Sequence, residues 1–272
     1  MVEWVLEPLQ YGFFQRGLMA GLIVAFSCGV LSAFIVWRGM AFIGDALAHA
    51  VLPGIVISII LGIHVLIGAL AAAMLSVVGI GALTRRKGFK EDTAIGVIFA
   101  GAFALGILLM SKVATFKDLS HILFGNILGV SSFDVILILS VGVVVVIGVY
   151  LFYKELLVTS FDPTHAQAIG LSPQLIHFGL LFLVAATTVL ATQTVGVVLV
   201  MALLVTPAAA ASLLARKLSK IISLSICFSM TSILFGFYIS YYFDLASGAT
   251  IVLVLTLFFL LSLILSKIKN RP

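Results

Sequence analysis

Charged residues are scarce in this sequence: only 9% of its 272 residues are Asp, Glu, Lys or Arg, whereas 63% are hydrophobic. A soluble domain carries about a quarter charged residues, so this chain has too few to cover a surface that faces water. The mean hydropathy of +1.33 agrees. The composition therefore excludes a soluble globular protein and predicts one that lies in a lipid bilayer.

Several chemical motifs are also missing. The two cysteines, Cys28 and Cys227, stand alone in apolar segments, which argues against a disulfide or a thiolate metal site. No GxxxxGK[ST] motif is present, so the chain has no P-loop for ATP, and the absence of HExxH leaves a zincin-type intramembrane protease without support. No relay of acidic residues and histidines runs through several apolar segments, which argues against a proton-coupled pump.

What the sequence does contain is a series of apolar segments, each long enough to cross a membrane as a helix. We predict one all-α polytopic permease domain over residues 1–272, with about eight to nine transmembrane helices. The candidate spans are 17–37, 40–62, 64–84, 93–111, 134–153, 174–192, 194–215, 220–242 and 248–266. Two pairs of neighbouring spans, 40–62 with 64–84 and 174–192 with 194–215, have no polar separator, so their divisions are the weakest.

The positive charges orient these spans. Most of the 15 Lys and Arg residues fall in the loop at 85–90, the loop at 216–220 and the tail at 267–271. Because basic loops stay on the cytoplasmic side, all three segments are expected there. The span count then places 154–173 in the cytoplasm too, and 112–133 outside. A net charge of +5 thus fits membrane topology and does not indicate nucleic-acid binding.

Asp45 and His49 are the candidate metal ligands. They lie inside an apolar span, in GDALAHAVLPG at 44–54, and their i, i+4 spacing places both side chains on one helix face. Ionisable groups within a membrane usually line an ion or substrate path. A carboxylate with an imidazole suits Mn²⁺, Fe²⁺ or Zn²⁺. Two ligands do not complete a site, but a two-fold dimer would supply four. A structural hydrogen bond between the two side chains is the alternative.

The cytoplasmic segment FDPTHAQAIGLSP at 161–173 predicts a short helix. Asp162 is a suitable N-cap and Pro163 a suitable first residue, while Gly170 provides the stop. Such a helix could dock into a groove on a soluble partner. It could equally be an ordinary loop helix.

Two further histidines are candidates for metal entry: His64 lies near a span junction, and His121 lies in the outer loop. Each is more simply read as a local hydrogen-bonding residue. The outer segment 112–133 contains apolar stretches interrupted by Gly125, Asn126 and Gly129, which is typical of a re-entrant or membrane-surface helix.

Five ordered segments together resemble the ABC-3 family of metal permeases, the membrane subunits of bacterial manganese, zinc and iron importers. These segments are GDALAHAVLPG (44–54), AIGVIFAGAFALGILL (94–109), HILFGNILGVS (121–131), FDPTHAQAIGLSP (161–173) and TVGVVLVMALLVTPAAAASLLA (194–215). The resemblance covers nearly the whole chain. It implies a permease bundle like that of the cobalamin importers, in the bacterial plasma membrane, and a transport subunit that is not itself an enzyme.

The resemblance also implies partners and roles. A second permease protomer, identical or not, would complete the dimer, with two copies of an ATP-binding subunit on the cytoplasmic side and an extracellular or periplasmic metal-binding protein outside. Asp45 and His49 would be the intramembrane metal ligands, and Asp162, Ala166 and Gly170 would belong to the helix that couples to the ATPase. No cofactor is expected to be bound permanently.

The transported ion is predicted to be a divalent transition metal. We favour manganese, because a mixed site with a carboxylate and no thiolate suits it, and keep zinc and ferrous iron as alternatives. A permease for metal chelates such as siderophores or cobalamin, an intramembrane enzyme and a membrane scaffold are more distant alternatives.

Overall fold

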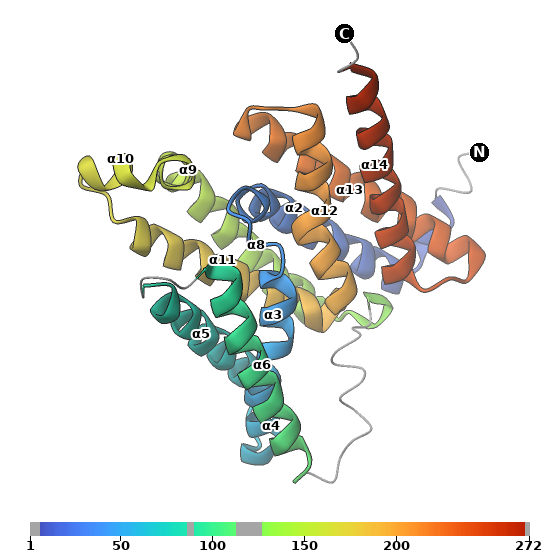
Figure 1. The fold of residues 1–272 in the computed structure, drawn as a ribbon. Helices are drawn as coiled ribbons and strands as arrows, with labels where there is room; N and C mark the ends of the chain where they lie inside the picture. The colour runs from blue at the N-terminus through green and yellow to red at the C-terminus, as the bar shows by residue number, and fades with distance from the viewer. Residues whose placement is uncertain (1–5, 86–89, 113–126, 270–272) are drawn as a thin grey trace.

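The computed structural model describes residues 6–85, 90–112 and 127–269. Within them the chain is helical and forms a bundle (Figure 1). The long helices are α2 (Gly12–Trp37), α5 (Val65–Thr84), α6 (Glu91–Met110), α8 (Ser132–Leu151), α11 (Pro173–Val195), α12 (Val197–Leu214), α13 (Leu218–Phe243) and α14 (Ser247–Lys269). The shorter elements are η1 (Pro8–Gln10), α3 (Ile43–Ala50), α4 (Leu52–Leu61), η2 (Ile127–Gly129), α9 (Tyr153–Phe161) and α10 (Pro163–Ala168).

In the described ranges, nine helical segments are long and apolar enough to cross a membrane, which confirms the predicted spans. The two weakest predicted divisions, between 40–62 and 64–84 and between 174–192 and 194–215, are both present, and a glycine lies at each of them. Gly62 (φ +66°) ends α4, and Gly196 (φ +91°) separates α11 from α12. Glycine adopts positive φ without steric cost, so the chain can reverse there without a polar loop.

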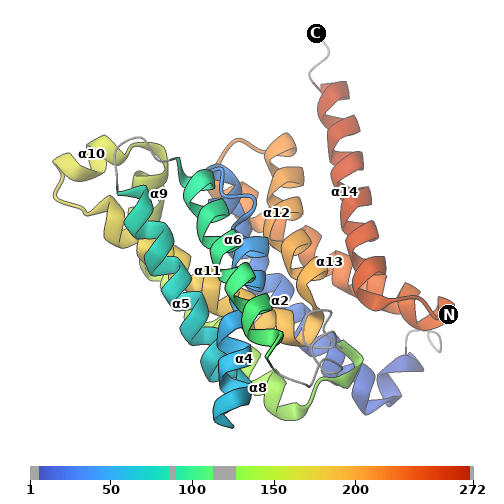
Figure 2. The same ribbon diagram turned by 60° about the horizontal axis from the view of Figure 1, so that its bottom comes forward.

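The order of the spans fixes which side each end faces. The basic segments at Arg85 and Arg216 follow α5 and α12, and α9 and α10 lie at the same end of the bundle, far from the turn that follows α4 (Figures 1 and 2). The positive-inside rule makes that end cytoplasmic. With the nine spans of the described residues, the first residue of α2, Gly12, then lies on the outer side.

Helix α2 forms the centre of the bundle, and α6, α8 and α14 form its outside. Within an apolar stretch of 18 residues, 72% of α2 is buried inside the protein, whereas the same measure gives 17% for α6. Phe34 and Leu31 of α2 are fully buried. The Ala208 N–H of α12, one residue after Pro207, donates to the Ser32 hydroxyl of α2 at 3.2 Å, so α2 also supplies a hydrogen-bond acceptor beside the proline.

The second span is broken at Val51, between α3 and α4. Pro53 has no N–H to donate to the His49 carbonyl four residues earlier, so a regular helix cannot run through this point. The carbonyl instead accepts from the Val51 N–H. Beyond the break α4 lies directly against α5, because Gly54 contacts the backbone of Gly68 with no side chain between them. The break thus lies two residues before Pro53.

Candidate metal site and ATPase-coupling helix

Asp45 and His49 lie side by side on α3. The His49 Nδ1 is 3.0 Å from the Asp45 carboxylate Oδ1 and also 3.0 Å from the Asp45 main-chain oxygen. Both oxygens are acceptors, so in the neutral imidazole Nδ1 carries the proton and Nε2 keeps its lone pair. This arrangement is typical of histidines that bind metals, in which a second hydrogen bond fixes the tautomer.

The rest of α3 is closed off by protein. Asp45 and His49 are its only partly exposed residues, with side chains 29% and 26% exposed, and the other six residues are buried. Gly44 brings α3 close to α12, since a Cβ at this position would meet Leu204 at 2.8 Å. The pair therefore occupies the one open side of a tightly packed helix.

Two aromatic side chains of α6 hold the imidazole from the side. The His49 ring centroid lies 5.8 Å from that of Phe99 and 5.4 Å from that of Phe103, in both cases at nearly perpendicular angles. The two phenylalanines stack on each other at 5.8 Å. Sequence reasoning missed these residues. Their i, i+4 spacing within 94–109 was the available signal, but it does not say which helix they face.

The cytoplasmic helix is present as predicted at its start. The Asp162 side chain accepts a hydrogen bond from the His165 N–H at 2.8 Å, and Pro163 is the first residue of α10. Ala166 is fully buried. The helix ends at Ala168 rather than at Gly170, and Gly170 takes a left-handed conformation at φ +83°. α10 projects from the bundle at its cytoplasmic end (Figure 1).

The other candidates do not join the Asp45–His49 pair. His64 is exposed at the start of α5, where its Nδ1 accepts from the Leu66 N–H at 3.3 Å, a capping role. His121 and most of the predicted outer segment 112–133 lie outside the described residues. Among the residues that are described, no group of three or more His, Cys, Asp or Glu side chains could hold a metal by itself.

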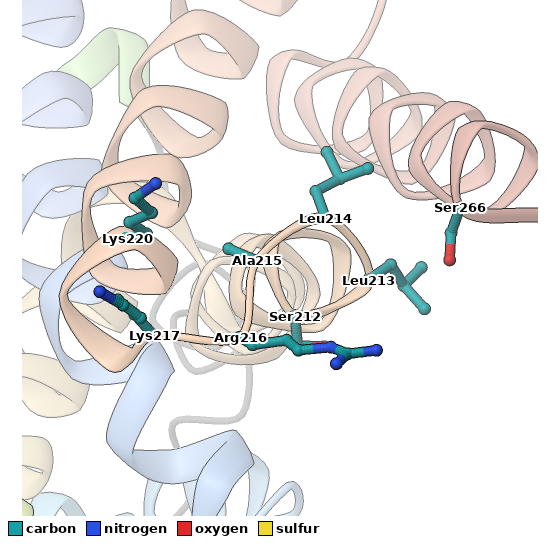
Figure 3. Close-up of a pocket in the computed structure, with 8 residues that line it drawn as sticks. All are labelled: Ser212, Leu213, Leu214, Ala215, Arg216, Lys217, Lys220 and Ser266. Carbon is teal, nitrogen blue, oxygen red and sulfur yellow. The ribbon is translucent and has the colours of Figure 1, made fainter. Parts of the chain in front are cut away.

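A separate pocket of about 520 Å³ opens between the cytoplasmic ends of α12, α13 and α14. Figure 3 shows Arg216 extending towards the side of α14 that carries Ser266, whereas Lys217 and Lys220 lie on the opposite side of the α12 terminus. Three cationic side chains repel a metal cation. This pocket therefore does not compete with Asp45 and His49 as a metal site.

A bundle of membrane-spanning helices, with an ionisable pair inside one span and a small capped helix on the cytoplasmic side, defines a membrane transport protein. The model of the ABC 3 transport family matches residues 10–266, and the chain belongs to this family. It is accordingly a multi-pass membrane component of an ABC transporter and not an enzyme, as the sequence predicted.

Individual relatives agree over nearly the full length. The chain is 46% identical over 254 residues to the manganese transport system membrane protein MntC of Listeria innocua, covering 93% of this chain and 91% of that protein. It is 42% identical over 271 residues to the probable iron transport system membrane protein of Haemophilus influenzae, covering 100% of both. A solved structure, PsaBC from Streptococcus pneumoniae in complex with Fab, matches with a TM-score of 0.84 at 39% identity, covering 96% of this chain and 94% of that one.

Proposed function

We propose that this chain is the permease of an ABC importer that carries a divalent transition metal into the cytoplasm, with manganese as the favoured ion. The names of the relatives, which refer to manganese and iron, support a metal of this kind. The donor set supports it as well, because a carboxylate with a neutral imidazole suits Mn²⁺ and Fe²⁺. Ferrous iron and zinc are the alternatives, since the same two donors bind them.

Asp45 and His49 are the proposed ligands. The observation that carries this assignment is the free Nε2 of His49, next to a carboxylate on the only open side of α3. Two ligands leave most of the coordination shell of a divalent cation unfilled. We infer that a second protomer brings a second pair to the same ion. That protomer is an identical chain or a close relative of this one.

Helix α10 is the proposed contact with the ATPase. It is short, capped at its start by Asp162 and followed by a turn at Gly170, and it lies at the cytoplasmic end of the bundle. Two copies of an ATP-binding subunit would each engage one protomer, and a metal-binding protein would deliver the ion from outside. ATP-driven movement of α10 would then open the path inward by a rigid-body change.

The test is metal uptake by cells that express the complete importer with Asp45→Asn or His49→Gln. Each substitution keeps the size of the side chain and removes a metal donor or its charge. We expect uptake of Mn²⁺ to fall by at least about tenfold, since even residues that only orient a ligand cost that much in other metal sites. Uptake at the level of the unmodified protein would contradict the assignment and would favour transport of a metal chelate, which needs no ligands in the path.

Two matched controls separate this loss from general damage. Asp244→Asn changes an acidic residue at the end of α13, where asparagine also tolerates the positive φ of 55°. His64→Asn changes an exposed histidine and keeps a side chain that caps a helix. Both controls are expected to transport normally.

A further inference from the structure

The ends of four helices meet at one polar cluster on the cytoplasmic side, here called the Arg38 cluster and made of Arg38, Glu91, Thr159, Ser160 and His177. Arg38 follows the last residue of α2. Its guanidinium donates from Nε to the Ser160 hydroxyl at 3.0 Å and from Nη2 to the Thr159 hydroxyl at 2.9 Å, both near the end of α9. The cluster thus ties the end of α2 to the end of α9.

His177 extends the cluster from Arg38 to Glu91. The Arg38 Nη1 lies 3.1 Å from the His177 Nδ1, and the His177 Nε2 lies 3.0 Å from the Glu91 Oε1. A guanidinium has donors only, so Nδ1 is the acceptor and the ring proton is on Nε2. Nε2 and the Glu91 Oε1 are in electrostatic contact but are not aligned for a hydrogen bond. The His177 ring therefore lies between a cation at the end of α2 and an anion at the start of α6.

The cluster is mostly closed to solvent, which makes its charges dependent on one another. Thr159 is buried and the His177 side chain is 16% exposed. Burial lowers the pKa of the Arg38 guanidinium, and the nearby Glu91 carboxylate opposes that shift. Because a buried charge that loses its partner is costly, the four helix ends are held together as a unit.

Residues of the Arg38 cluster lie close in sequence to both the proposed ATPase contact and the proposed metal ligands. Ser160 is two residues before Asp162, the N-cap of α10. On the other side, Arg38 is seven residues before Asp45, and the turn between them is closed by hydrogen bonds from Met40 to Ile35 and from Ile43 to Met40.

Glu91 is also connected to the Asp45–His49 pair, in this case through helix α6. It is the first residue of α6, the helix that carries Phe99 and Phe103 against His49. Helix α6 thus begins at the Arg38 cluster, and α3, which carries the pair, begins at Ile43, a short turn after Arg38.

We propose that Arg38, His177 and Glu91 are positioning residues that transmit movement of α9 and α10 to α3 and α6. This inference rests on the proposed function, because it takes α10 as the ATPase contact and Asp45 with His49 as the metal ligands. A shift of the α9–α10 segment moves Arg38, because the Thr159 and Ser160 hydroxyls accept hydrogen bonds from its guanidinium. The same movement reaches Glu91 through the contacts of His177 with Arg38 and with Glu91.

The experiment compares two substitutions of His177 in the complete importer reconstituted in lipid vesicles, with Mn²⁺ uptake and ATP hydrolysis measured together. His177→Gln keeps an acceptor for Arg38 and a donor for Glu91, whereas His177→Leu keeps neither. We expect the Leu variant to carry about tenfold fewer Mn²⁺ ions per ATP hydrolysed, a typical size for coupling between sites. The Gln variant should recover most of the loss, and equilibrium Mn²⁺ binding should be unchanged in both.

Two results would overturn the proposal. Uptake and ATP hydrolysis that fall in proportion, so that the ratio stays constant, would show that the cluster only stabilises the fold. A loss of equilibrium Mn²⁺ binding would show that it shapes the metal site directly. If the Leu variant does not fold, Glu91→Gln provides the same comparison, since it removes the charge and keeps the shape.

A failure of the coupling role can be distinguished from a failure of the proposed function. Asp45→Asn in the same vesicles tests the metal ligands, and Gly170→Val tests the α10 contact. Suppose that His177→Leu changes the number of Mn²⁺ ions transported per ATP hydrolysed, while Asp45→Asn transports normally. This result would refute the metal assignment and would leave the coupling role of the cluster in place.

Discussion

His49 is held by two kinds of neighbour, and together they fix the direction of its free nitrogen. The hydrogen bond from Nδ1 to Asp45 sets the tautomer. The rings of Phe99 and Phe103 limit rotation of the imidazole about its side-chain bonds. A ligand that is already oriented loses little conformational entropy when the metal arrives, so these phenylalanines should contribute to affinity without touching the ion.

We therefore predict that Phe103→Ala weakens Mn²⁺ binding by about tenfold, the lower end of the effect seen for residues that support metal ligands. Isothermal titration of the purified transporter with Mn²⁺ measures the change. Phe133→Ala is the matched control, because Phe133 is exposed at the start of α8, and its Kd should stay the same. Equal affinities for Phe103→Ala and the unmodified protein would show that Phe103 does not orient His49.

At the scale of whole helices, the features that the sequence predicts correctly are those that depend on local patterns. Apolar length predicted the nine spans, and the i, i+4 spacing predicted that Asp45 and His49 share a face. The cap at Asp162 and the proline at 163 predicted where α10 begins. Each of these follows from residues that are near one another in the chain.

Contacts between helices could not be predicted in the same way. Nothing in 94–109 shows that Phe99 and Phe103 face α3 rather than lipid, because α6 is apolar on every side. Arg38 and His177 are 139 residues apart, and no local pattern around His177, near the start of the predicted span 174–192, indicates a partner for it. Their meeting depends on how α2, α9 and α11 pack, which no single segment encodes.

The turn after α10 leads to a prediction at this scale. Gly170 has open space around it, so its positive φ of 83° is the only constraint on the residue placed there. A β-branched residue is strained in this conformation by about 1–2 kcal/mol, whereas asparagine tolerates it. We expect Gly170→Val to reduce Mn²⁺ transported per ATP hydrolysed, and Gly170→Asn to have little effect.

Gly179→Val is the control for this pair of variants. Gly179 also has open space around it but takes an ordinary helical conformation in α11. Coupling should be normal in this variant when uptake and ATP hydrolysis are measured in the same vesicles. If Gly170→Val transports as many ions per ATP as the control does, the conformation of this turn is not needed for coupling.

At the scale of the whole molecule, the proposed metal ligands lie on an open side of the chain. Asp45 and His49 are the partly exposed residues of α3, and in the described residues no third carboxylate, imidazole or thiolate joins them. The adjoining helix α6 is the least buried of the spans in the described part of the chain. Both features are consistent with a second protomer that packs against this side and completes the coordination.

A shared site and two independent sites give different results when one protomer is damaged. We predict that a transporter with one unmodified protomer and one carrying Asp45→Asn with His49→Gln, purified through two different affinity tags, binds Mn²⁺ much more weakly than the unmodified pair. The reason is that a shared ion loses half of its protein ligands. Independent sites would instead leave one site per two chains at the original Kd. Titration of the mixed pair with Mn²⁺, beside an unmodified pair that carries the same two tags, distinguishes weaker affinity from a halved number of sites, and the second result would refute the shared site.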